Sequence, residues 1–155
     1  MDTSLDDRAA RMSARAPDWA RVALGLVAVP QLVVGLWAVL APRHFFDHFP
    51  GFGPLLVAAE PPFNAHLTSD TGTGFVATGV FAAVAAGWGL RPLVFVAGLS
   101  LSAFALPHFC YHLLNPAELL SGAENVVNVV VLGVALAVPV AVAWANRPRG
   151  AAVRN

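Results

Sequence analysis

The sequence predicts an all-α protein, a bundle of four transmembrane helices, and three observations support this fold class. Apolar residues make up 57% of the 155 residues and charged residues only 12%, whereas a soluble domain carries about 25% charged residues. Four stretches are apolar over roughly the 20 residues that a helix needs to cross a bilayer. The arginines lie almost entirely on one side of the resulting topology. We therefore expect a single integral membrane domain.

The four predicted spans cover residues 21–41, 71–90, 92–114 and 123–145. The first apolar run is longer than the core of about 7–15 residues in a signal peptide, so we expect it to be retained as a span. Three spans contain an internal proline, namely Pro30, Pro107 and Pro139. A helix tolerates proline inside a membrane bundle because neighbouring groups satisfy the carbonyls that the proline frees.

Charge distribution predicts the orientation of these spans. If the tails 1–20 and 146–155 are cytoplasmic, eight of the nine arginines lie inside and only Arg43 lies outside. This asymmetry follows the positive-inside rule. Tryptophans lie at the span boundaries, where amphipathic rings are enriched. We expect a multi-pass cell-membrane protein with both termini cytoplasmic, surface tails, and a long outer loop between the first and second spans.

Composition also limits the partners. The formal net charge is zero, so electrostatics offers no case for nucleic-acid binding. A single cysteine, Cys110, excludes an intrachain disulfide. The lipid bilayer is the predicted environment. Small residues recur at helical spacing in the second and fourth spans, at Gly79, Ala83, Gly87, Gly133, Ala137, Ala141 and Ala145. Such faces allow close helix packing within the bundle, in a homo-oligomer, or against a membrane-protein partner.

Polar residues gather on the predicted outer side. All five histidines fall there, at His44, His48, His66, His108 and His112. Several repeat at a spacing of four, which places both members of a pair on one helix face. Imidazole and carboxylate groups are common ligands of zinc, iron and copper. One hypothesis is therefore an outer metal or redox site with ligands His66, His108, His112, Asp70 and Glu124, supported by Asn64, Asn128 and Tyr111.

Some of these acidic residues have a second interpretation as helix caps. Ser121 and Glu124 have the spacing of a capping box. Glu118, three residues after Asn115, matches a variant of it, and Asp70 or the residue before it could cap the second span.

Other polar residues also have structural alternatives. His44 and His48, flanked by phenylalanines, fit an interfacial position as well as a ligand role. Gln31, beside Pro30, fits either a bond to a carbonyl that the proline frees or a polar pathway.

Three segments carry a family resemblance. Phe49-Pro50-Gly51, the run from Phe63 to Gly72, and Pro107-His108-Phe109-Cys110-Tyr111-His112 resemble the FPG, YNEHLxxDxG and PHxxYH motifs of a group of small, uncharacterised bacterial four-helix integral membrane proteins. This chain has Phe63 and Ala65 where that pattern has tyrosine and glutamate. The resemblance implies the four-helix architecture and a shared importance of His66, Asp70, His108 and His112, and it implies no activity. A looser similarity to DoxX-type membrane proteins rests on size and span number.

Three functions follow from these observations as hypotheses. The first is the outer metal or redox site. The second is a structural or accessory subunit of a membrane complex that docks through the small-residue faces. The third is a small proton-linked transporter in which the histidines titrate. Against the transporter, few polar residues lie in the inner parts of the spans, so no polar path across the membrane is evident.

Overall fold

The computed structural model describes residues 13–148, and this range contains five α-helices. The four long ones are α2 (Asp18–Leu40), α4 (Ala65–Trp88), α5 (Arg91–Leu114) and α6 (Gly122–Asn146), and the short α3 (Pro42–His48) follows α2. All four long helices are long and apolar enough to cross a membrane. At a rise of 1.5 Å per residue they extend about 35 Å, against a hydrocarbon core of about 30 Å. The expectation of an all-α protein with four span-like helices is confirmed.

The helix bounds agree with the predicted spans except at the start of α4. This helix begins at Ala65, six residues before the expected start at residue 71. Its N-cap is Asn64, whose side-chain oxygen accepts a hydrogen bond from the backbone N–H of Leu67 at 3.0 Å. The prediction that Asp70 or Ser69 caps this helix is therefore wrong, because Asn64 already satisfies an orphan N–H one turn earlier.

The connection between α2 and α4 holds a helix that the sequence analysis did not predict. Pro42 stands at the start of α3, where its missing N–H costs no hydrogen bond. The buried Phe45 of α3 meets the ring of Trp37 edge-on, with ring centroids 5.6 Å apart. Through this contact α3 folds back on the end of α2.

The long helices form two tightly packed pairs, α2 with α4 and α5 with α6. Glycine permits the close approach in each pair. A Cβ at Gly35 would lie 2.7 Å from the backbone nitrogen of Val76, and one at Gly98 would lie 2.9 Å from the carbonyl oxygen of Pro139. Of the small residues singled out in the sequence, Gly79 packs against α2, whereas Ala83, Gly87, Ala137 and Ala141 are exposed. The exposed small residues are accessible on the surface. Their contact with a partner remains a prediction.

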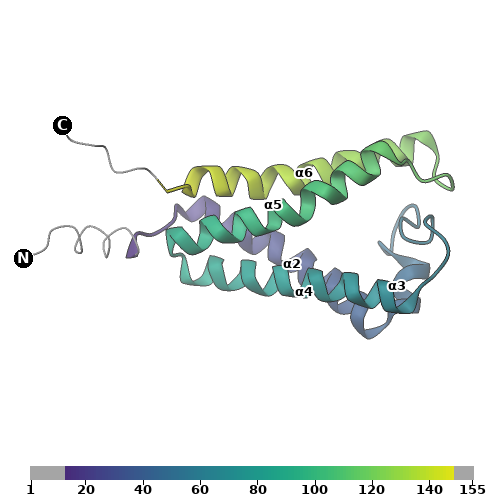
Figure 1. Cartoon of the computed structure of the whole chain (residues 1–155), viewed down its shortest axis with the longest axis horizontal. Coiled ribbons are helices and arrows are strands. Elements are labelled where there is room, and N and C mark those ends of the chain that lie inside the picture. The colour runs from purple at the N-terminus through teal and green to yellow at the C-terminus, as the bar shows by residue number, and fades with distance from the viewer. Residues whose placement is uncertain (1–12, 149–155) are drawn as a thin grey trace, which may run out of the picture.

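The two pairs meet at one end and separate toward the other (Figure 1). We call the end where α2 and α5 begin and α4 and α6 finish the terminal end, and the opposite end the loop end. The main buried cluster lies at the terminal end and includes Leu24, Ala85, Val94 and Val142, each with no exposed surface. The pairs are therefore joined by a core at the terminal end.

Arginines complete the terminal end. The side chains of Arg15 and Arg21 donate to the carbonyls of Trp88 and Ala86, and Arg91 donates to Ala145. Each acceptor belongs to the last turn of a helix, where carbonyls lack partners inside the helix. Residues preceding α2 also pack here, since the Ala16 N–H donates to Gly89. The described part of the tail 1–20 is thus held against the α4–α5 turn, and residues 1–12 lie outside the described range.

Candidate functional site

The five residues predicted as metal ligands fall in three separate places. His66 and Asp70 pair on α4, His108 and His112 lie on α5, and Glu124 stands at the start of α6. In residues 13–148, no group of three or more His, Cys, Asp or Glu side chains is placed to hold a metal ion. The zinc, iron or copper hypothesis therefore gains no ligand set from the described part of the chain.

His66 and Asp70 form an open surface pair. Their Nε2 and Oδ2 atoms lie 3.3 Å apart, and the two side chains are 87% and 60% exposed. A pair this exposed contributes little to stability because water competes for both groups. Asn64, expected to support a metal site, instead caps the same helix.

Glu124 acts as a helix cap. Its carboxylate accepts the Ser121 N–H at 2.8 Å, while the Ser121 hydroxyl accepts the Glu124 N–H at 3.3 Å. This reciprocal pair confirms the predicted capping box. The second predicted cap, Glu118, lies in the α5–α6 turn outside any helix, so that expectation is wrong. Asn115 instead ends α5 and bonds back to the Tyr111 carbonyl.

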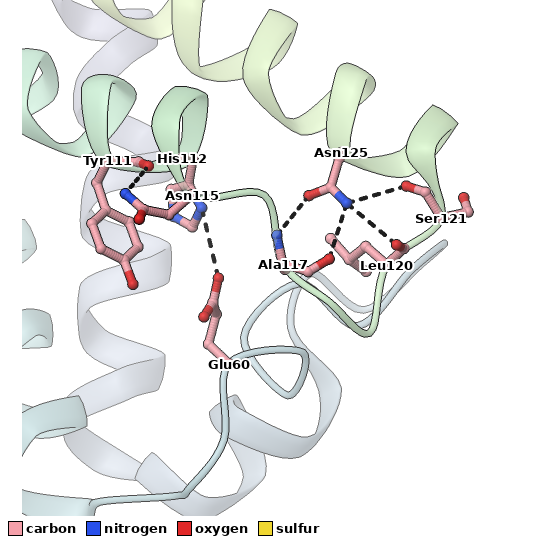
Figure 2. A network of polar contacts seen from close by, with 8 residues as sticks. All are labelled: Glu60, Tyr111, His112, Asn115, Ala117, Leu120, Ser121 and Asn125. Atoms are coloured by element: carbon pink, nitrogen blue, oxygen red, sulfur yellow. Dashed lines mark hydrogen bonds and ion pairs between the residues drawn. The ribbon is translucent and has the colours of Figure 1, made fainter.

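The two histidines near the end of α5 connect to a residue from the α3–α4 loop (Figure 2). The rings of His108 and His112 meet edge-on with centroids 4.9 Å apart. Nδ1 of His112 lies 4.0 Å from Oε1 of Glu60. That oxygen is buried and has no hydrogen-bond partner within the described residues. Tyr111, predicted as a supporting residue, packs its ring edge-on against His112 at 5.3 Å.

His44 and His48 lie together at the surface on α3. Their rings stack with centroids 4.3 Å apart, and both residues are exposed. The indole N–H of Trp37 donates to Nδ1 of His44 at 2.9 Å. These two histidines form an aromatic surface around α3, away from His108 and His112.

A cavity of about 520 Å³ lies between the two helix pairs. Most of its lining is aliphatic or aromatic, and the polar residues among its lining are Gln31 and His108. On α5 the lining runs from Leu101 to His108, which is about 10 Å along the helix axis. His108 is therefore the lining residue of α5 nearest the loop end. The volume is typical of sites that hold drug-sized ligands.

The walls of the cavity are uneven. Between α4 and α5, the rings of Phe75 and Phe104 meet edge-on at 4.9 Å and close that side. On the opposite side α2 and α6 touch much less than the members of each pair do. Lining residues there, among them Leu26 and Val134, keep 69% and 59% of their surface exposed. The lining of the cavity is therefore exposed at the surface of the bundle between α2 and α6.

The two polar lining residues have spare hydrogen-bonding capacity. The Oε1 atom of Gln31 lies 3.5 Å from the hydroxyl of Thr78, and its amide donors have no partner among the described residues. Among the described residues Gln31 makes no bond to a carbonyl freed by Pro30, so that interpretation is wrong. The ring nitrogens of His108 likewise have no hydrogen-bond partner within residues 13–148. Both groups point to a ligand or water, since unpaired polar groups are costly in an apolar setting.

Two residues important here belong to the polar residues of the predicted outer side but were not chosen as candidate site residues. Glu60 meets His112 only because the loop folds back over α5, although an acidic residue beside two prolines in an apolar loop was a usable signal. Asn125 holds the α5–α6 turn through bonds to Ala117 and to two further carbonyls. No local pattern distinguishes Asn125 from Asn128, which makes no such bonds.

Comparisons with protein-family models, with curated proteins and with solved structures find no match for this chain. The resemblance to the small four-helix membrane proteins therefore stays an expectation based on the three motifs.

Proposed function

We propose that this protein resides in the cell membrane and binds a small lipid-soluble molecule in the cavity between its two helix pairs. The observation that carries the proposal is a cavity of about 520 Å³ within the membrane-spanning part of the bundle, open sideways between α2 and α6. A ligand could enter from the lipid without crossing the loops. Gln31 and His108 would bind its polar group.

Orientation is part of the same proposal. Arg15, Arg21, Arg91 and Arg147 all belong to the terminal end, while Arg43 alone among the described arginines belongs to the loop end. The positive-inside rule then supports a cytoplasmic terminal end and an outer loop end. In this orientation both chain ends are cytoplasmic and the histidines face the outer side.

The other hypotheses have weaker support. A metal site lacks three gathered ligands in residues 13–148. Transport across the membrane would need a polar path beyond the cavity, and the buried cluster around Leu24 and Val94 fills the bundle at the terminal end. A role as an accessory subunit stays a prediction.

The proposal is tested with a photoreactive alcohol, decanol carrying a diazirine, added to protein in lipid nanodiscs. Cross-linked peptides should include those around Gln31 and Ala135, both of which line the cavity. Ala135→Phe fills part of this space, and we expect it to reduce cross-linking by about tenfold, which corresponds to about 1.4 kcal/mol of binding free energy.

The matched control is Ala137→Phe, on the same helix at an exposed position outside the cavity lining. It should leave the cross-linking yield at Gln31 unchanged. Equal labelling of all lipid-facing surfaces, with no loss in Ala135→Phe, would overturn the proposal.

A further inference from the structure

Three ionisable side chains lead from the cavity toward the loop end. His108 lines the cavity, His112 lies one helical turn farther on with its ring against that of His108, and Glu60 follows at 4.0 Å from His112. Figure 2 shows Glu60 reaching from its loop toward His112. Chains of histidine and carboxylate at membrane depth are the usual components of proton pathways.

The series His108, His112 and Glu60 has fewer acidic groups than basic ones. Within residues 13–148, the titratable groups in ring or ion-pair contact with His112 are His108 and Tyr111 on its own helix and Glu60 from the loop. Two imidazoles thus share one carboxylate. If Glu60 pairs with a protonated His112, a proton on His108 still lacks a counter-charge. An anionic group bound in the cavity beside His108 would supply it.

Membrane energetics favours the same arrangement. A carboxylate without a partner in an apolar cavity is strongly disfavoured because it loses its hydration. A protonated imidazole alone is disfavoured for the same reason. The two together form a neutral pair, so each makes the other acceptable in the cavity.

We propose that the ligand is a lipid-soluble carboxylic acid, bound with its carboxylate against His108, and that the accompanying proton passes through Glu60 and His112. This inference rests on the proposed function, since it names the ligand class of the same cavity. His108 contacts the ligand. Glu60 and His112 act as positioning and proton-carrying residues between the cavity and the aqueous loop end.

The proton balance is simple. A free carboxylate ion and a neutral His108 enter the reaction together with one proton from water, and the product is a carboxylate paired with a protonated His108. No electron is transferred and no covalent bond to carbon changes. The proton first binds the Glu60 carboxylate, moves to His112, and then moves to His108. The move from Glu60 to His112 requires a ring rotation or a bridging water, because 4.0 Å exceeds a direct hydrogen bond.

The experiment compares decanoate with decanol, which has the same chain without the acid, using protein in lipid nanodiscs at about pH 8, where a free carboxylate with a pKa near 4 is ionised. Calorimetry in two buffers of different protonation enthalpy gives the number of protons taken up. We expect decanoate to bind at least about tenfold more tightly than decanol. Binding of decanoate should take up about one proton, and binding of decanol none.

Variants separate the roles of the three residues. His108→Gln should abolish both the preference for decanoate and the proton uptake while decanol still binds. His112→Gln and Glu60→Gln should keep the uptake but slow it, as followed by a pH-sensitive dye after rapid mixing. His66→Gln, at an exposed position outside this chain of residues, is the matched control and should behave as wild type.

The outcomes are distinguishable. If decanol fails to bind the wild-type protein, the proposed function itself is wrong. If decanol binds and decanoate shows no preference and no proton uptake, only the assignment of an acidic ligand is overturned. Unchanged uptake rates in both His112→Gln and Glu60→Gln would overturn the proton path.

Discussion

The two ends of the bundle are built by different means. At the terminal end all four long helices share a buried cluster that includes Leu24, Val94 and Val142. Arginine side chains there bind the last carbonyls of α4 and α6. At the loop end the two helix pairs stand apart (Figure 1). Side-chain contacts to loops and turns, such as those of Glu60 and Asn125, connect the elements there.

This difference explains where the cavity lies. Tight packing at one end fixes the pairs to each other, and their separation toward the other end leaves space between them. The cavity begins beside Leu101 and Pro139, next to the core, and reaches His108 near the loop end. Open space and polar groups thus occur where packing is weakest, which is typical of binding sites built on a rigid base.

The ends also differ in the origin of their polar contacts. Arginines at the terminal end satisfy carbonyls that the helices themselves leave without partners, so their bonds maintain the fold. The histidines at the loop end make few bonds to the backbone. His108 makes none among the described residues. Within residues 13–148, the polar groups left free beside the cavity are those of His108 and Gln31, whereas the unpartnered Oδ1 of Asn146 at the terminal end does not line it.

The largest predicted difference between the ends is their location across the membrane. In a Cys110→Ser background we expect Phe52→Cys, in the exposed loop, to react with a membrane-impermeant maleimide in intact cells. Pro148→Cys, at the terminal end, should react only after the cells are permeabilised. We expect this difference in labelling because segments rich in arginine are retained on the cytoplasmic side.

The control for this labelling is detergent-solubilised protein, in which both cysteines should react fully. Reaction of Pro148→Cys in intact cells, with Phe52→Cys protected, would reverse the proposed orientation of the two ends.

The second prediction concerns packing. Leu24 is completely buried at the terminal end, whereas Leu36, on the same helix toward the loop end, is 47% exposed. Leu24→Ala should lower the free energy of unfolding by about 2 kcal/mol or more, because the space it leaves cannot be refilled. Leu36→Ala should cost less than about 0.5 kcal/mol. Unfolding in detergent micelles, followed by circular dichroism, measures both. Equal costs would mean that the terminal end has no special role in stability.

Much of this contrast could be predicted from the sequence. The four spans are predicted by the length of the apolar segments. The separation of arginine from histidine is predicted by their positions relative to these spans. Both depend on amino-acid composition, because the bilayer core strongly restricts which segments can span it. The capping box at Ser121 was also predictable, because its partners are three residues apart.

The remaining features depend on contacts between distant residues. The cavity exists because the close approaches at Gly35 and Gly98 fix each pair while leaving the pairs apart at the loop end. Glu60 and His112 are 52 positions apart, and only the fold of the loop brings them together. The start of α4 was misplaced because polar residues in its first turns resemble a loop, although Asn64 begins the helix before them.

The smallest predicted effect tests how the loop end is ordered without a core. The side-chain amide of Asn125 accepts the Ala117 N–H at 2.9 Å and donates to the Ala117 carbonyl at 3.0 Å, and so closes the α5–α6 turn. Asn125→Leu keeps the size of the side chain and removes these bonds. We expect a local loss of about 1 kcal/mol, or roughly fivefold faster amide exchange in residues 117–121.

Hydrogen–deuterium exchange measured by mass spectrometry resolves this segment from the rest of the chain. Asn128→Leu, one turn farther along α6, is the matched control and should leave the exchange of the turn unchanged, because Asn128 bonds to none of it. The amides around Leu24 should be equally protected in both variants, since the terminal end is held by its own core. Faster exchange at Leu24 in Asn125→Leu would mean that the two ends are energetically coupled, and the cavity between them would then respond to changes in the loops.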